Sequence, residues 1–316
     1  MKLAKALVMR LLFGVLSLVF ISLVTFMADE LAPGDAATAI IGEKATPGAV
    51  AALRQEMGLD RPWPIRYVEF VGRAVQGDFG KSYYGTKEPV STILSQNLPM
   101  TIRVATMAIL LAALIGISLG TWAAVRQNRG ADRFVLTLST LGVTIPNFVL
   151  APILVYIFAV QLDRLPTTWA VDRVAPDIYY LILPVVILSL RPMALLTRLT
   201  RSSMIETLNQ EFIRLAVAKG VPKMRLVLRH ALRNAILPVI TAIGTSLGFL
   251  LTGSFIVETA FALPGIGREG IEAIQKGDTP LIQATVLVAG ALFIGINLLV
   301  DLLIPILDPR VREAAV

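Results

Sequence analysis

The sequence has 316 residues, of which 16% are charged, compared with about 25% in ordinary soluble domains. Long uncharged runs, a hydrophobic content of 55% and a mean hydropathy of +0.73 favour a polytopic membrane protein. The chain has no cysteine and a single histidine, which excludes disulfides, thiol nucleophiles, cysteine-based metal sites and histidine clusters.

Apolar runs long enough, or nearly long enough, for a membrane span of about 20 residues recur along the chain. The six runs cover residues 11–28, 102–125, 134–160, 178–197, 235–257 and 281–304. The first follows Lys2, Lys5 and Arg10, as in a signal peptide, but it is longer than the usual apolar core of about 7–15 residues. No clear cleavage site follows it, so we expect an uncleaved N-terminal anchor over residues 1–28.

Residues 29–100 are expected to form a small helical lobe outside the membrane. Thr46-Pro47 is a typical helix start and Gly58 a typical stop, while Pro64 and Gly77 bound a second helix in the same way. The lobe is the only large surface that this arrangement places outside, so we expect it to meet an external partner.

The lobe contains the sequence GDFGKS at 77–82, whose GKS resembles the end of a phosphate-binding loop. Val75 stands where the full loop needs a glycine, and ATP is scarce outside the cell. We therefore interpret this sequence as a surface turn.

Small and polar residues inside the expected spans indicate packing sites and breaks. GISLG (116–120) and GTSLG (244–248) are small-xxx-small patterns that allow close helix contact, although glycine is also simply common in membrane helices. Pro146 and Pro152 interrupt the third span and Pro184 the fourth, and such breaks can line a cavity.

Two polar positions within the spans leave alternatives open. Arg191 either lines a polar path that attracts an anionic group or snorkels to the inner headgroups, and snorkelling is favoured. Asn297 and Asp301 share one face of the sixth span, where a helix–helix hydrogen bond is favoured over a proton relay.

The distribution of basic residues predicts the topology and explains the net charge of +7. With the N-terminus inside, the inner segments hold sixteen Lys or Arg and five Asp or Glu. The two short outer loops, 161–177 and 258–280, hold four basic and seven acidic residues. The positive-inside rule therefore places both termini in the cytoplasm and leaves little ground for nucleic-acid binding.

A basic stretch with helical periodicity separates the fourth and fifth spans. The S-x-x-E sequence at Ser203 and Glu206 predicts a helix start. An apolar stripe is expected on this helix at Ile205, Leu208, Phe212 and Leu215, with Arg214 and Lys219 outside it.

A bend is predicted at the end of this helix, because Gly220 fits a left-handed stop and Pro222 fits the start of the next helix. The amphipathic helix could lie on the bilayer with its basic side chains at the headgroups, or lay one face into a groove of a partner protein. Periodicity alone does not decide between them.

EFIRLAVAKG (211–220) and LVLRHALRNAILP (226–238) resemble the cytoplasmic coupling loop of ABC-importer permeases, in particular the branch that imports di- and oligopeptides. The resemblance covers essentially the whole chain and is closest to the first transmembrane subunit of oligopeptide permeases. Its further segments, in chain order, are LAPGD (31–35), GLDRPWPIRYVEF (58–70), QGDFGKS (76–82), IPNF (145–148), TRSSM (200–204), ETAFALPGIG (258–267) and NLLVDLL…DPR (297–310).

This resemblance implies an all-α polytopic membrane protein in the bacterial cytoplasmic (inner) membrane. Six transmembrane helices of the ABC-importer permease fold are expected, with the external lobe at 29–100. The remaining five helices form a core over 101–310 that contains a cytoplasmic coupling loop at about 198–234.

The resemblance also implies partners and cargo. A second homologous permease, two ATP-binding cassette subunits and an external solute-binding protein are expected. ATP and Mg would be bound by the ATPase subunits, because this chain lacks a Walker motif, is not an enzyme and needs no cofactor of its own. The expected cargo is a peptide, with a nickel chelate or glutathione as alternatives.

Site residues follow from the same resemblance. Arg214, Leu215 and Ala216 occupy the E-A-A triplet of the general permease motif, in which only Ala216 and Gly220 agree. Asn147 and Arg191 are candidates for the translocation path. The residues expected to couple to the ATPases are Glu211, Phe212, Arg214, Leu215, Ala216, Lys219 and Gly220.

Other classes of protein fit the sequence less well. An ion-coupled secondary transporter would need acids near the membrane midplane, and only Asp301 is a candidate. An intramembrane enzyme would need a nucleophile with its base, or a metal site, and the sequence suggests neither.

Overall fold

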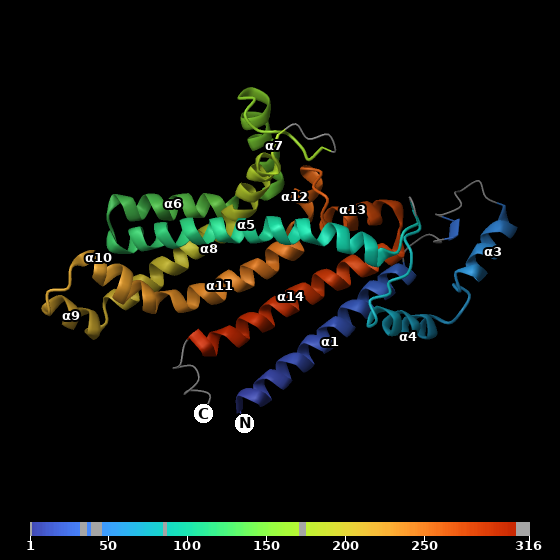
Figure 1. The fold of residues 1–316 in the computed structure, drawn as a ribbon, viewed down its shortest axis with the longest axis horizontal. Coiled ribbons are helices and arrows are strands. Elements are labelled where there is room, and N and C mark those ends of the chain that lie inside the picture. The colour runs from blue at the N-terminus through green and yellow to red at the C-terminus, as the bar shows by residue number, and fades with distance from the viewer. Residues whose placement is uncertain (1, 32–36, 39–45, 85–86, 171–174, 308–316) are drawn as a thin grey trace.

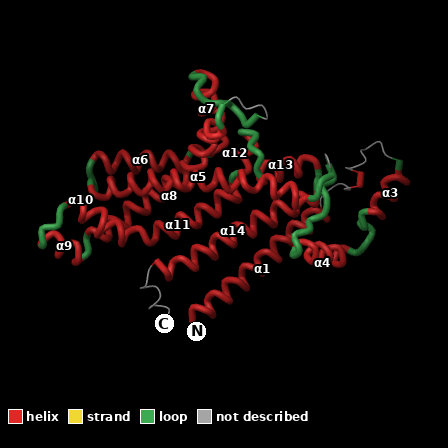
Figure 2. The backbone as a smooth tube through the Cα atoms, in the orientation of Figure 1, coloured by secondary structure: helices red, strands yellow, loops and turns green. Residues whose placement is uncertain are grey.

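The computed structural model describes residues 2–31, 37–38, 46–84, 87–170 and 175–307. Within these residues the chain consists of helices and their connections, without a β-strand (Figures 1 and 2). The expected all-α fold is confirmed. The LAPGD residues 32–35 and the terminal DPR at 308–310 lie outside the described residues.

Among the described residues, five helical segments are long and apolar enough to cross a membrane. They overlap the expected spans but extend beyond them. The helix of the expected second span begins at residue 90 rather than 102, and the helix of the expected fourth span continues to 208 rather than 197. The second therefore runs without a break across position 100, where the lobe was expected to end. The segments are α1 (Lys2–Leu31), α5 (Val90–Val125), α8 (Asp177–Leu208), α11 (Leu232–Gly253) with the short helices before it, and α14 (Thr279–Leu307).

The third expected span is a bent pair of helices. α6 (Gly130–Thr144) and α7 (Asn147–Val155), which continues into the π-helical segment η1 (Tyr156–Gln161), meet at 100°. Pro146 lies at the bend, and Ile145 before it is extended, as a residue preceding proline tends to be. Counted as one broken span, the pair brings the number of candidate spans in the described part of the chain to six.

α8 is the central helix of the bundle. Over the most apolar 18 residues of α8, 56% of the residues are buried, compared with 11% over the corresponding stretches of α1 and α14. Gly116 and Gly120 let α5 pack directly on α8, because a Cβ at Gly120 would lie 2.5 Å from the carbonyl oxygen of Thr197. Gly244 and Gly248 allow the same closeness between α11 and α14, so both glycine patterns serve helix packing.

The lobe contains α3 (Pro47–Glu56) and α4 (Trp63–Ala74). Gly58 and Gly77 follow these helices with φ of 67° and 78°, which confirms both predicted stops. The lobe packs on α1 through Phe26, whose ring centre lies 5.4 Å from that of Tyr67.

The GDFGKS sequence is a turn, but it does not lie wholly at the surface. Ser82 is buried, and its hydroxyl donates to the carboxylate of Asp278, directly before α14. The same carboxylate accepts the backbone N–H of Tyr83 at 3.2 Å. The turn is therefore anchored to the membrane bundle.

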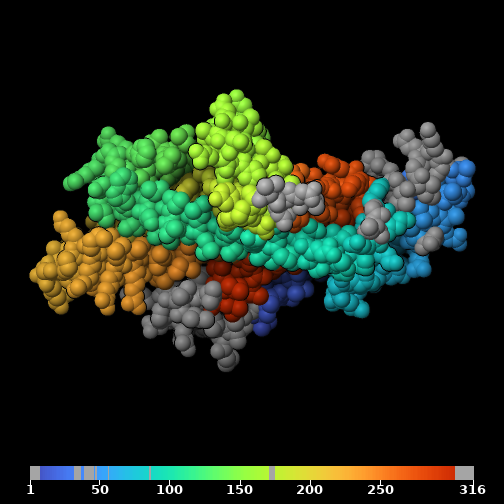
Figure 3. Space-filling model, turned by 45° about the horizontal axis from the view of Figure 1, so that its top comes forward, coloured from blue at the N-terminus to red at the C-terminus, as the bar shows by residue number. Residues whose placement is uncertain are grey.

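The lobe and the basic stretch lie at opposite ends of the molecule, as the blue and orange surfaces in Figure 3 show. The start of α1 and the end of α14 both point away from the lobe (Figure 1). Arg10 of α1 forms an ion pair with Asp301 of α14. The expected contact of Asp301 between helices is thus present as an ion pair, while the amide of Asn297 donates within its own helix to Phe293.

Candidate functional site

The basic stretch folds into α9 (Glu211–Ala218), α10 (Lys223–Arg225) and the π-helical segment η2 (Leu226–Ala231), which leads into α11. Gly220 has a φ of 78°, the N–H of Val221 donates to the Ala216 carbonyl at 3.2 Å, and the N–H of Gly220 donates to Val217 at 2.9 Å. These are the two hydrogen bonds of a Schellman motif. The predicted stop at Gly220 and the start at Pro222 are confirmed.

The predicted helix start at Ser203 is wrong. α8 continues through Ser203 and Glu206 to Leu208, and α9 begins only after Gln210. Met204 is completely buried at this point, so packing keeps the chain helical where a local capping signal favoured a start. Propensity and capping are weak compared with burial of a large apolar side chain.

The predicted apolar stripe is also wrong, because the turn at Asn209 and Gln210 separates its two halves. Ile213 is the inward residue of α9, at 3% exposure, and it packs in one cluster with Met204 and Leu226. Phe212 and Leu215, expected on one face with Ile205 and Leu208, are 43% and 58% exposed.

The outward side of α9 is therefore both apolar and charged, and we call it the α9 surface. Ala216 is half-buried beneath it, and Gly220 is exposed at its end. The exposed side chains that form the α9 surface are Glu211, Phe212, Arg214, Leu215, Val217 and Lys219. The structure thus brings the expected coupling residues together at the end of the bundle opposite the lobe.

The two path candidates lie on different helices. Arg191 is exposed near the middle of α8, directly before Pro192. Asn147 is half-buried at the first position of α7, after the bend at Pro146. Within the described part of the chain, neither side chain forms a hydrogen bond or ion pair, so the structure leaves Arg191 available to a partner or solute.

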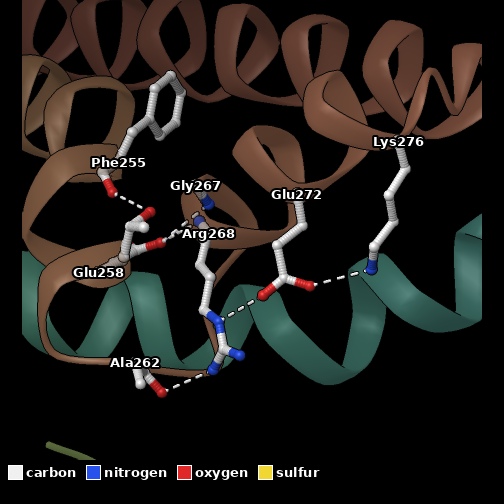
Figure 4. Close-up of polar contacts among 8 residues, drawn as sticks. Phe255, Glu258, Ala262, Gly267, Arg268, Glu272 and Lys276 are labelled. Carbon is white, nitrogen blue, oxygen red and sulfur yellow. Dashed lines mark hydrogen bonds and ion pairs between the residues drawn. The ribbon is translucent and has the colours of Figure 1, made fainter.

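A buried acid, which the sequence analysis treated only as a loop charge, organises the part of the bundle nearer the lobe (Figures 1 and 4). Glu258 lies in α12 (Phe255–Ala260) and is fully buried. Its carboxylate accepts the Ser254 hydroxyl at 2.7 Å and the backbone N–H groups of Gly267 and Arg268 at 2.8 and 3.2 Å. The latter two begin α13 (Ile266–Lys276), so the acid caps this helix and complements its dipole.

Two glycines of the ETAFALPGIG segment leave the space that the Glu258 carboxylate occupies. A Cβ at Gly267 would lie 2.8 Å from Oε2 of Glu258, and one at Gly265 would also collide with the carboxylate. The N–H of Ile266 donates to the hydroxyl of Thr101 at 3.0 Å, which fastens the same corner to α5. We call the set of Thr101, Ser254, Glu258 and the start of α13 the outer corner.

Charged side chains along α13 extend the outer corner (Figure 4). Arg268 donates to Glu272 at 2.7 Å and to the carbonyl of Ala262 at 2.8 Å, and Lys276 donates to Glu272 at 3.3 Å. Burial works to raise the pKa of Glu272, but the hydrogen bonds and charges of Arg268 and Lys276 outweigh it and lower the pKa. Burial, and then the charge of Glu272, raises the pKa of Glu269.

A buried ion pair joins α6 and α8 near the end of the bundle that carries α9 (Figure 1). Asp132 of α6 is buried, and it accepts from Arg201 of α8 at 2.7 Å and from the backbone N–H of Asn128 at 2.8 Å. The sequence analysis counted both side chains only as topology charges. Their separation of 69 positions provided no local signal for pairing.

Comparison with known proteins assigns this architecture to a family. Residues 116–313 match the family described as binding-protein-dependent transport system inner membrane component, and residues 3–105 match the description of its N-terminal part. A probable peptide ABC transporter permease of Sinorhizobium fredii is 39% identical, covering 96% of this chain and 97% of the relative. A putative peptide permease of Brucella ovis is 38% identical with the same coverage. A glutathione transport system permease of Salmonella typhimurium is 37% identical, again over 96% of this chain and 97% of the relative.

Proposed function

Since this chain belongs to the family of binding-protein-dependent transport system inner membrane components, we propose that it is the permease subunit of an ATP-driven ABC importer of peptides. The protein is a multi-pass membrane protein and a transport subunit rather than an enzyme. The observation that carries the peptide assignment is full-length similarity to permeases named for peptides. Glutathione is the second candidate cargo, supported by the relative from Salmonella typhimurium.

The transporter is proposed to contain two ATPase subunits, which bind ATP and Mg in the cytoplasm. The α9 surface is proposed to dock onto one of them. Exposed Phe212 and Leu215 stand beside Arg214 and Lys219, the mixture of apolar anchors and cations that fits a groove in a partner protein. Closure of the ATPases would move α9, and the buried contact of Ile213 with Met204 and Leu226 connects that movement to α8 and η2. The ATPases can change the side of the membrane to which the path opens only through contacts with the permease that differ between their two states.

The proposed topology places α9 and both termini in the cytoplasm of the bacterial inner membrane. It rests on the sixteen-to-five charge count of the inner segments and on the opposite positions of α9 and the lobe. The lobe would then face the external solute-binding protein, and a second homologous permease would complete the path.

Arg191 and Asn147 are proposed to line that path. An arginine near the middle of a membrane helix is costly in lipid unless it faces water or a partner. Arg191 is exposed on α8, the most buried helix, and it has no pairing partner within the described residues. Its charge suits the terminal carboxylate of a peptide.

Uptake by the reconstituted transporter tests the function. Vesicles that contain both permeases and the ATPases, supplied with the binding protein and ATP, should accumulate a labelled peptide. Unlabelled glutathione should compete only if it shares the path. Arg191→Gln should weaken uptake about tenfold, while Arg198→Gln, seven positions nearer the end of α8, should change it little. The proposal would be refuted if neither the peptide nor glutathione were taken up in an ATP-dependent way.

A labelling experiment tests the topology separately. The chain has no cysteine, so Leu215→Cys introduces a single thiol on the α9 surface. An impermeant reagent should leave this thiol unmodified in intact spheroplasts and modify it after lysis. Labelling in intact spheroplasts would place α9 outside and reverse the orientation.

A further inference from the structure

A groove separates the last turns of α5 from the segment formed by α10, η2 and the start of α11. Its volume is about 390 Å³, and its lining is mainly apolar. Ile117, Trp122 and Val125 form part of the α5 wall, and Lys223, Leu228 and Leu232 form part of the other. Both walls belong to the end of the molecule that carries α9 (Figure 1).

The groove changes character along its length. Trp122 and Lys223 lie at the loop end, where α5 finishes and α10 begins, whereas Ile117 and Leu232 lie deeper along their helices. At the loop end the Arg126 guanidinium lies 5.1 Å from the centre of the Trp122 ring. Two cations therefore flank the mouth, and no acid is among the described residues that line the groove.

The dimensions suit one leaflet of a membrane. From Ile117 to Val125 the helix rises about 12 Å, which is slightly less than the roughly 15 Å hydrocarbon depth of a leaflet. Met224 and Leu228 are 71% and 52% exposed on the wall, so they require an apolar cover. An amphiphile with its charged end at the loops and its tail along the helices satisfies both ends of the groove.

We propose that this groove binds an anionic phospholipid, with the headgroup at Lys223 and Arg126 and an acyl chain between Ile117 and Leu232. Basic pockets between helices on the cytoplasmic side suit anionic headgroups, and a tryptophan belongs at the headgroup level. The bound lipid would brace α10 against α5, directly after the bend at Gly220. The inference rests on the proposed inner orientation of α9 and is independent of the cargo.

The chain offers a matched pair of charge reversals. Lys223→Glu alters a residue of the groove lining, whereas Arg225→Glu makes the same change in net charge two positions away, outside the lining. The purified transporter complex would be titrated with phosphatidylglycerol and with phosphatidylcholine in neutral nanodiscs, and retained lipid counted by native mass spectrometry. We expect phosphatidylglycerol to be preferred, Lys223→Glu to weaken its retention at least about fivefold, and Arg225→Glu to leave it within about twofold.

Leu228→Trp provides a second measurement that does not depend on charge, because the larger side chain fills the apolar part of the groove. Phosphatidylglycerol should raise the thermal midpoint of the wild-type complex more than phosphatidylcholine does, and Leu228→Trp should abolish this difference. Equal retention of the two lipids, equal effects of the two charge reversals, or a preserved shift in Leu228→Trp would each overturn the proposal. Should Lys223→Glu fail to assemble, the wild-type preference and Leu228→Trp decide alone. Uptake assays report on the cargo separately, so failure here leaves the transport function standing.

Discussion

The outer corner and the α9 surface make opposite use of their side chains. At the outer corner, Glu258 is fully buried, and its carboxylate accepts from Ser254 and from the first turn of α13. On the α9 surface, Phe212 and Leu215 remain exposed, while Ile213 is buried and Ala216 packs half-buried against the same cluster. The first region is complete within this subunit, and the second has the composition of a surface that becomes complete only in an assembly.

This difference separates a rigid region of the subunit from its proposed coupling surface. A buried, hydrogen-bonded carboxylate fixes the corner between α12, α13 and α5, because breaking it would leave charged and polar groups unpaired in an apolar environment. A short helix held by one buried side chain and a glycine bend can move as a unit when a partner pulls on it. The predictions below test that division, from the largest expected effect to the smallest.

Glu258→Ala should break the outer corner. It removes the acceptor of two backbone N–H groups and of the Ser254 hydroxyl, and we expect a loss of about 3 kcal/mol or more in stability. Thermal unfolding of the purified protein in detergent measures the loss. Thr259→Ala, which removes an exposed hydroxyl from the same helix, is the control and should differ little from wild type. A near-normal midpoint for Glu258→Ala would mean that the corner is not an anchor.

Replacing Phe212 and Leu215 together by serine should affect docking rather than stability. Stability should change little because both side chains are exposed, while ATPase docking should weaken by about 2 kcal/mol or more if they are interface anchors. Copurification of the ATPase subunits measures docking. Ile213→Ala is the comparison, since removal of a buried side chain should cost about 2–5 kcal/mol of stability. Unchanged docking by the serine variant would favour a helix that lies on the headgroups instead.

Gly220→Val tests the bend that presents the α9 surface. A β-branched residue at a φ of 78° should be strained by about 1–2 kcal/mol. A Cβ at this position meets no atom within 4 Å, so the strain arises from the backbone and not from a clash. We expect normal membrane insertion with weakened ATPase docking and lost uptake. Wild-type coupling in this variant would remove the bend from the mechanism.

Glu269→Gln and Glu272→Gln should have small and opposite effects. The lowered pKa of Glu272 means that its ionised form stabilises the fold above its unfolded pKa, and this contribution is lost as the pH falls through the folded value. The raised pKa of Glu269 means that ionisation weakens the fold as the pH rises towards the folded value.

At neutral pH, Glu272→Gln should therefore destabilise and Glu269→Gln stabilise, each by less than about 1 kcal/mol because solvent screens these partly exposed groups. Thermal midpoints would be measured at neutral and at acidic pH. For both variants, the difference from the wild-type midpoint should shrink on acidification. Effects of the same sign would contradict the assigned pKa directions.

Short-range features of this protein were predictable from its sequence. The stops at Gly58, Gly77 and Gly220 were predicted because a residue without Cβ adopts positive φ at low cost, and proline at the next helix start reinforces the signal. The apolar runs predicted the long helices because a span must satisfy its own backbone. The order of the permease-like segments was sufficient to indicate the family.

Only the tertiary structure decided which side chains these helices bury. The sequence predicted a helix start at Ser203 and an apolar face through Phe212, but distant neighbours keep α8 helical around Met204 and turn Ile213 inward instead. Glu258 and Asp132 gave no local signal of burial, because their partners on α13 and α8 are supplied by the fold. Backbone limits at glycine and proline act within a few residues, whereas burial depends on contacts between residues far apart in the chain.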